Sequence, residues 1–257
     1  MSSRELTLAA CLSLASVVPV ASALAPRDTE VWTPIPREVT PAERPGGAPS
    51  DAVVLLGEHD RDLHEWVSTA TRGPAGWGVR DGVLTVNKAA GNIETRRQFR
   101  DFQLHLEWRI PSEITGTGQA RGNSGVFLAS TGPGDAGYEI QILDSYRNAT
   151  YVNGQAASVY KQYPPLVNAS RHPGEWQSYD IVWTAPRFDG AGLVSPARVT
   201  VLHNGVLVQN DVPLRGETVF IGQPQYRPYA AAPIKLQAHG DPSPPISFRQ
   251  IWVRELD

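Results

Sequence analysis

The polar side chains best suited to chemistry lie in the segment from Gly137 to Asp144. Glu139 and Gln141 alternate there with apolar residues, so an extended strand places both polar side chains on one face. A β-bulge after Gln141 would return Asp144 to that face. A carboxylate on a strand face can act as general base, nucleophile or metal ligand. We therefore predict that Glu139 and Asp144 are catalytic, in a polar row that suits a sugar cleft.

A second candidate, His239, ends a predicted strand from Ile234 to His239. Lys235, Gln237 and His239 share one face of that strand because side chains alternate with a period of two. Histidine titrates near neutral pH and can carry protons or bind metal. We predict that Glu139 and His239 open into one hollow on a curved sheet, and that His239 is also catalytic.

Other polar and aromatic residues are predicted to bind the substrate. Their side chains can hydrogen-bond to sugar hydroxyls or to a polarised carbonyl, and a tyrosine ring can stack on a pyranose. The predicted set is Lys88, Asn123, Gln141, Tyr160, Gln237 and Arg249. A divalent metal ion held by Glu139 and His239 is an alternative, but one histidine and one carboxylate do not establish a metal site.

These residues require a sheet to position them, and the sequence is typical of an all-β domain. Short segments of alternating apolar and polar residues recur, and the clearest runs from Asp101 to Ile110. Asp81-Gly82 and Asn204-Gly205 predict tight hairpin turns. About a dozen such strands with hardly any helical periodicity predict two antiparallel sheets packed face to face. The long segment 145–175 is predicted to line a site.

Composition and termini limit the class of protein. The chain has 257 residues and a net charge of −3, so no basic field favours nucleic acid. Residues 1–25 resemble a signal peptide, with Arg4 before a short apolar run. Residues 26–50 are rich in proline and are predicted to form an extension, whereas 51–257 form one domain. We expect an exported protein, periplasmic or secreted, with no transmembrane segment in the mature chain.

Several motifs together resemble the 3-keto-disaccharide hydrolase domain family, also described as 3-keto-glucoside 1,2-lyase/3-keto-2-hydroxyglucal hydratase. The resemblance extends from about Asp51 to Asp257. The motifs that carry it are Gly91-Asn92-Ile93, Asp101 to Trp108, Gly122 to Val126, Tyr138 to Asp144, Gly174 to Asp180, His203 to Val206, Leu236 to Gly240 and Phe248 to Trp252. It implies a concanavalin-like jelly roll and exported bacterial members that act on oxidised sugars. Asn92 stands where Asp is expected, and Ala238 where a polar residue is common.

The resemblance implies cleavage of 3-keto-glycosides. A base, Glu139 or His239, would remove the acidic C2 proton, the C1 substituent would leave, and water would add to the resulting glucal. One alternative is a retaining glycosidase with Glu139 as nucleophile and Asp144 as acid/base. Another is a carbohydrate-binding module without catalysis, because fold does not determine function.

Overall fold

The computed structural model describes residues 24–190 and 192–256. The chain divides into two compact units, Met1–Glu38 and Val39–Asp257. In the first unit, a short 3-10 turn, η1 (Pro26–Thr29), precedes an extended proline-rich segment. Most of the predicted signal peptide lies outside the described residues, so export stays a prediction.

The second unit includes the last part of the proline-rich extension. Within it, the Thr40 backbone N–H donates to Ser50 Oγ at 2.9 Å. The Trp252 Nε1–H donates to the Gly46 carbonyl oxygen at 2.9 Å. Because these bonds join residues 39–50 to each other and to a strand of the domain, the folded domain begins before Asp51.

The larger of the two main sheets has eight antiparallel strands, and their order differs from their order in the sequence. Across the sheet they are β13 (Val206–Pro213), β12 (Arg198–His203), β9 (Trp176–Thr184), β6 (Phe102–Arg109), β15 (Ser247–Glu255), β4 (Val83–Thr85) and β3 (Gly78–Arg80), with β1 (Val53–Leu56) also paired to β15. Asp81 and Gly82 both have positive φ, as do Asn204 and Gly205, which confirms the two tight hairpin turns predicted from these dipeptides.

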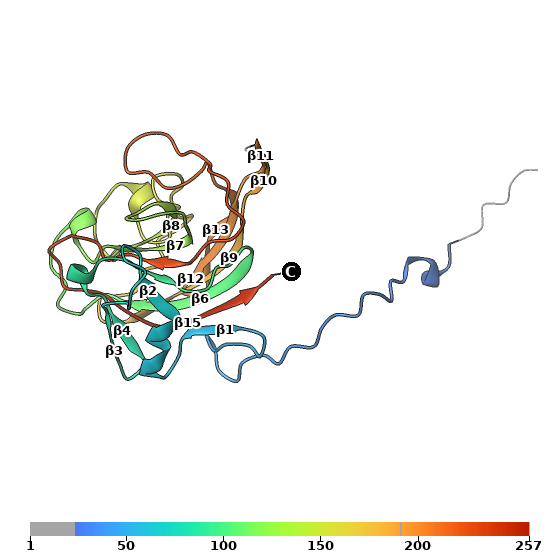
Figure 1. The fold of residues 1–257 in the computed structure, drawn as a ribbon, viewed down its shortest axis with the longest axis horizontal. Coiled ribbons are helices and arrows are strands. Elements are labelled where there is room, and N and C mark those ends of the chain that lie inside the picture. The colour runs from blue at the N-terminus through green and yellow to red at the C-terminus, as the bar shows by residue number, and fades with distance from the viewer. Residues whose placement is uncertain (1–23, 191, 257) are drawn as a thin grey trace, which may run out of the picture. The chain divides into compact units, whose positions relative to one another are not determined.

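The second sheet has five antiparallel strands. Across the sheet they are β2 (Trp66–Ser68), β5 (Ile93–Thr95), β14 (Lys235–Leu236), β7 (Ser124–Ser130) and β8 (Gly137–Ile142). The ribbon in Figure 1 draws β7 and β8 in a layer separate from β6, β12 and β15. The remaining elements are the hairpin β10 (Arg187–Asp189) and β11 (Gly192–Ser195), and the 3-10 turns η2 (Asp60–Glu65), η3 (Lys88–Ala90), η4 (Gly118–Ala120) and η5 (Val152–Gly154).

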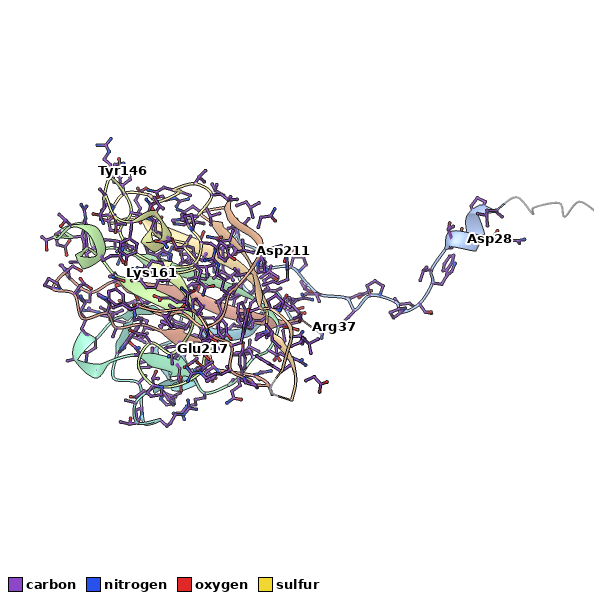
Figure 2. All side chains as sticks on the ribbon, turned by 90° about the horizontal axis from the view of Figure 1, so that it is seen from above. Asp28, Arg37, Tyr146, Lys161, Asp211 and Glu217 are labelled. Carbon is purple, nitrogen blue, oxygen red and sulfur yellow. The ribbon has the colours of Figure 1, made fainter. Side chains whose placement is uncertain are left out.

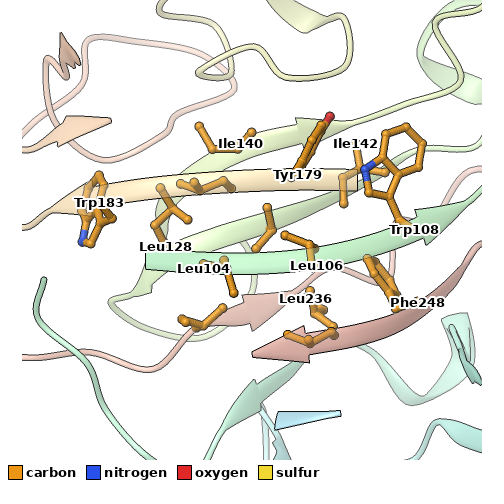
Figure 3. Close-up of a cluster of buried hydrophobic side chains, with 14 of the residues drawn as sticks. Leu104, Leu106, Trp108, Leu128, Ile140, Ile142, Tyr179, Trp183, Leu236 and Phe248 are labelled. Atoms are coloured by element: carbon orange, nitrogen blue, oxygen red, sulfur yellow. The ribbon is translucent and has the colours of Figure 1, made fainter. Parts of the chain in front are cut away.

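The hydrophobic core lies between these two sheets. Strand β6 contributes Leu104, Leu106 and Trp108, all fully buried, as its alternating pattern predicts. Figure 3 shows their side chains close to those of Ile140 and Ile142 from β8. Burying one such large apolar side chain contributes about 1.5–3 kcal/mol to folding. The fold is therefore the predicted all-β jelly-roll sandwich of antiparallel sheets.

The two faces of β8 have different neighbours. Tyr138, Ile140 and Ile142 are buried in the core, so Glu139 and Gln141 point to the opposite face of the five-stranded sheet. The free edge of β8 is covered by the segment that follows it, because the Gln141 N–H donates to the Ser158 carbonyl at 3.0 Å. The core therefore fixes both polar side chains on the outer face.

Among the described residues, no helix has the length and apolar character needed to cross a membrane.

Candidate active site

A cavity of about 560 Å³ opens on the outer face of the five-stranded sheet. Strand β8 supplies Glu139 and Gln141, and the segment after β14 supplies Gln237 and His239. Loops between strands supply the rest of the lining. The full set is Gln119, Asn123, Asp135, Glu139, Gln141, Tyr151, Tyr160, Thr218, Phe220, Gln237 and His239. The structure thus brings Glu139 and His239 to one hollow, as the sequence predicted.

Glu139 lies at the base of the cavity, directly over the backbone of Gly125. A Cβ added at Gly125 would lie 2.3 Å from Glu139 Oε1, so a larger residue there would displace this carboxyl group. Burial raises the pKa of Glu139 well above its usual value, and the charge of nearby Asp135 raises it further against an opposing effect of Lys235. The raised pKa favours the protonated form of Glu139, which can donate a hydrogen bond.

His239 forms a pair with Asp241, two residues further along the chain. The imidazole Nδ1 lies 3.1 Å from Asp241 Oδ2. Asp241 is almost fully buried, whereas the His239 side chain is 37% exposed and lines the cavity. The carboxylate thus lies behind the ring, and the reactive face of the ring is open to a ligand.

The surrounding amides favour one tautomer of His239. The Asn123 amide nitrogen donates to the Gln119 carbonyl oxygen at 2.8 Å, and its Oδ1 accepts from Gln141 Nε2 at 3.0 Å. This orientation directs the Asn123 amide nitrogen, a donor, toward His239 Nε2 at 3.5 Å. Nε2 is then the acceptor, so Nδ1 carries the proton and donates it to Asp241. In the other tautomer, Nδ1 would instead accept a hydrogen bond from the Asp241 backbone N–H, which lies 3.2 Å away.

Hydrogen bonds keep Asp241 ionised. Burial acts to raise its pKa, but hydrogen bonds from His239, Ser243 and Lys88 together lower it to about 2. Lys88 Nζ lies 3.1 Å from Asp241 Oδ2, and it also donates to the carbonyl oxygens of Asp241 and Ser243. Lys88, predicted to bind substrate, instead lies behind the histidine and holds its partner carboxylate.

One wall of the cavity is aromatic. The Tyr151 and Tyr160 hydroxyl groups lie 2.7 Å apart in a hydrogen bond, and Phe220 completes the wall. The ammonium group of Lys161, labelled in Figure 2, lies 4.3 Å from the Tyr151 ring centroid and 5.0 Å from that of Phe220. Tyr160 therefore lines the cavity as predicted, although its hydroxyl is already bonded.

Gln237 offers an acceptor that the protein itself does not use. Its side chain is buried and lines the cavity, and its Oε1 has no hydrogen-bond partner among the described residues. A buried acceptor without a partner costs about 1–3 kcal/mol. Gln237 therefore lines the cavity, and its Oε1 is enclosed by protein.

The predicted position of Asp144 is wrong. Strands β7 and β8 pair regularly from Ser124–Ile142 to Phe127–Glu139, so the expected bulge after Gln141 is absent. Asp144 is buried outside the cavity lining and forms an ion pair with Arg121 at 2.6 Å. Its pKa is raised by burial, an effect that Arg121 opposes. Because no extra residue follows Gln141 in the strand, the alternation of side chains directs Asp144 away from the face that carries Glu139.

The predicted position of Arg249 is also wrong. Arg249 lies on β15 of the eight-stranded sheet, whereas the cavity lies on the five-stranded sheet. Its Nε donates to Glu107 at 2.5 Å, and its guanidinium lies 4.1 Å from the Trp176 ring centroid. The arginine therefore belongs to a surface cluster on the other sheet.

The described residues hold no group of three or more histidine, cysteine, aspartate and glutamate side chains that could bind a metal ion. Glu139 and His239 line one cavity but supply only two ligands, and the Nδ1 of His239 is engaged by Asp241. These residues do not fit a metal site built from three protein ligands.

Sequence reasoning missed Asp241 and the residues that loops bring to the cavity. The missed lining residues are Gln119, Asp135, Tyr151, Thr218 and Phe220. Asp241 carried a usable signal, because it follows His239 in the short sequence His-Gly-Asp. Tyr151 lies in the segment 145–175, whose length predicted a site lining but not which of its residues would form it. The other loop residues carried no signal, because irregular segments have no periodicity from which direction can be inferred.

Comparison with known proteins assigns the family. The model of the 3-keto-alpha-glucoside-1,2-lyase-like domain matches residues 51–254. The chain belongs to this family. The 3-keto-alpha-glucoside-1,2-lyase-like domain thus accounts for nearly all of the folded unit, and membership assigns the chain a carbohydrate-active function. No protein with a curated description matches the chain at a significant level.

Solved structures agree with this family. A crystal structure from Parabacteroides distasonis ATCC 8503, described as "a putative glycosyl hydrolase", is 49% identical in sequence. It matches with a TM-score of 0.84 over 91% of this chain and 98% of that chain. A second structure from the same organism, with the same description, is 19% identical and has a TM-score of 0.56 over 82% of this chain and 95% of that chain, which shows the shared fold.

Proposed function

We propose that the protein cleaves 3-keto-glycosides by elimination followed by hydration. The 3-keto group acidifies the hydrogen on C2, so a base can remove that proton and the electron pair forms an enolate. The enolate then expels the oxygen substituent from C1, leaving a 2-hydroxyglucal. Water adds across the new double bond, with hydroxide at C1 and a proton at C2, so the net reaction is hydrolysis. The observation that carries the proposal is the Asp241–His239 pair facing a cavity that has Glu139 at its base.

His239 is the base in this proposal. Its Nε2 is the unprotonated nitrogen, and the ionised carboxylate of Asp241 stabilises the imidazolium that forms when the C2 proton arrives. The same imidazolium can return the proton to the departing C1 oxygen. Positioned acid–base groups of this kind accelerate proton transfer by about 10²–10⁴-fold.

Glu139 is the hydrogen-bond donor to the C3 oxygen. In this proposal the Glu139 carboxyl group, whose pKa is raised by burial, carries a proton and donates a hydrogen bond as negative charge develops on the enolate oxygen. The Gln237 side chain, which lines the cavity, would contact the same sugar. Removing a single donor to a developing oxyanion typically costs about 10²–10³-fold in rate.

Retaining glycoside hydrolysis with Glu139 as nucleophile and Asp144 as acid/base has no support from their positions. The two carboxyl groups do not share the cavity, because Asp144 is buried against Arg121. A retaining mechanism requires two carboxyl groups on either side of one scissile bond.

The test compares a 3-keto-disaccharide with its unoxidised parent as substrates. We expect cleavage of the ketone alone, because only the ketone has an acidic C2 hydrogen. Cleavage of the parent at a similar rate would indicate ordinary glycoside hydrolysis, and binding of either sugar without turnover would indicate a binding module. Both results would overturn the proposal.

A further inference from the structure

The turn from Thr131 to Ala136, which joins β7 to β8, is held by a buried cation. Lys235 is fully buried, and its ammonium group donates to the carbonyl oxygens of Gly132, Gly134 and Ala136 at 3.0, 2.9 and 2.7 Å. Tips of surface turns are ordinarily the more variable and mobile parts of a domain. Three hydrogen bonds from one buried side chain therefore fix the position of this turn.

Asn92 holds the same turn from another side. Its Nδ2 donates to the Gly134 carbonyl oxygen at 3.0 Å and to Asp135 Oδ1 at 3.1 Å. Its Oδ1 accepts from the Ala238 backbone N–H at 2.8 Å. That backbone donor fixes the orientation of the amide, because only the oxygen can accept. One side chain therefore connects Asp135 to the segment that carries His239.

Asp135 is the residue that these contacts hold in place. It lines the cavity together with Glu139 and His239. Its Oδ1 accepts from Asn92, and among the described residues no hydrogen bond reaches Oδ2. An ionised carboxylate accepts hydrogen bonds and donates none, so a ligand group beside Oδ2 has to be a donor.

We propose that Asp135 binds a hydroxyl group of a neutral sugar through Oδ2, and that Asn92 is the positioning residue for this contact. The proposal rests on the proposed function and names its substrate class as neutral hydroxyl-bearing sugars. A sugar carboxylate or phosphate next to Asp135 would repel it, because neither ionised group can donate. Asp135 was not among the residues expected from the sequence.

The experiment is a double-mutant cycle with Asn92→Asp, Asp135→Ala and both together. In Asn92→Asp, a carboxylate oxygen would replace the amide nitrogen opposite Asp135 Oδ1 and push Asp135 away. We expect KM for the 3-keto-disaccharide to rise about ten- to hundredfold in each single variant, the effect of losing a charge-assisted hydrogen bond. The double variant should be no worse than Asp135→Ala alone.

Monodeoxy analogues of the sugar separate binding from a structural effect. Wild type should bind the analogue that lacks the contacted hydroxyl as weakly as Asp135→Ala binds it. Every other analogue should still bind wild type more tightly than it binds Asp135→Ala. Asp189→Ala, an exposed carboxylate on β10, is the matched control and should leave KM unchanged.

Calorimetric binding of the unoxidised parent sugar by the same proteins requires no turnover. It therefore decides this inference even if no 3-keto sugar is cleaved and the proposed function fails. Additive effects of Asn92→Asp and Asp135→Ala, or wild-type affinity in Asp135→Ala, would overturn the inference.

Discussion

The described part of the chain contains two histidine–aspartate pairs with opposite exposure. In the cavity, His239 is 37% exposed and Asp241 only 2%. On the eight-stranded sheet, His105 Nδ1 lies 2.7 Å from Asp180 Oδ1, but the histidine is 3% exposed and the aspartate 40%. The histidine is thus the exposed member of the pair in the cavity, and the aspartate is the exposed member of the pair on the eight-stranded sheet.

The difference follows from what covers each ring. His105 stacks on Trp252 with ring centroids 5.5 Å apart, and its buried Nε2 has no hydrogen-bond partner among residues 24–190 and 192–256. A Cβ at Gly46 would lie 3.1 Å from that nitrogen, so the backbone of the 39–50 segment closes over the ring. Only a pair with its imidazole open and its carboxylate buried can transfer a proton to a ligand.

The largest effect should come from the two equivalent substitutions His239→Gln and His105→Gln. We expect His239→Gln to lower kcat for the 3-keto-disaccharide by about 10²–10⁴-fold, because the base is lost. His105→Gln should leave kcat within about twofold and lower the free energy of unfolding by about 1–3 kcal/mol. Steady-state kinetics and urea unfolding measure the two quantities. Similar kinetic losses in both variants would remove the distinction between the pairs.

Asp241→Asn should reduce kcat by about 10²-fold or more, because an amide cannot stabilise the imidazolium. The folded pKa of about 2 lies below the usual value of 3.8, so Asp241 stabilises the fold above pH 3.8 and loses this contribution as pH falls toward 2. Unfolding measurements should show a loss of about 2 kcal/mol at pH 7 in the variant and little difference at pH 2. An equal loss of unfolding free energy at pH 7 and pH 2 would contradict the link between the lowered pKa of Asp241 and stability.

Glu139→Gln should lower kcat by about tenfold and Glu139→Ala by more, because glutamine remains a neutral donor. The raised pKa of Glu139 means that the folded state retains a proton that the unfolded chain loses, so wild type loses stability as pH rises from the unfolded pKa through the folded one. Glu139→Gln should remove that slope in unfolding measurements. A nucleophilic Glu139 would instead make the glutamine variant inactive.

Arg249→Ala should have the smallest effect, because its guanidinium lies on the eight-stranded sheet. We expect kcat and KM within twofold of wild type and a stability loss of about 1 kcal/mol or less, as for partly exposed ion pairs. A large rise in KM would mean that this sheet also contacts the substrate.

The sequence predicted the fold where local pattern and burial agree. Alternation along Asp101 to Ile110 correctly predicted the buried apolar residues of β6, and the same rule placed Glu139 and Gln141 on the outer face. It was wrong for His105, which was expected to face water or a cleft and is buried. The rule failed for Asp144, because one residue more or less after a strand reverses the direction of every later side chain.

The candidate site was predicted only in part because loops complete it. Asp135 reaches the cavity through a turn held by Lys235 and Asn92, which are distant in sequence. The role of Lys88 depends on Asp241, which contacts it across the fold. Such contacts arise from tertiary packing and leave no periodic signal in the sequence.

The central claim is that His239 removes the C2 proton of a 3-keto sugar. Cleavage in D₂O tests it most directly, with nuclear magnetic resonance used to measure deuterium at C2 of the released 3-keto sugar. The released sugar incubated without protein corrects for spontaneous exchange. We predict one deuterium at C2 with wild type, and neither cleavage nor exchange above background with His239→Gln. Released sugar that keeps its original C2 hydrogen would contradict the account.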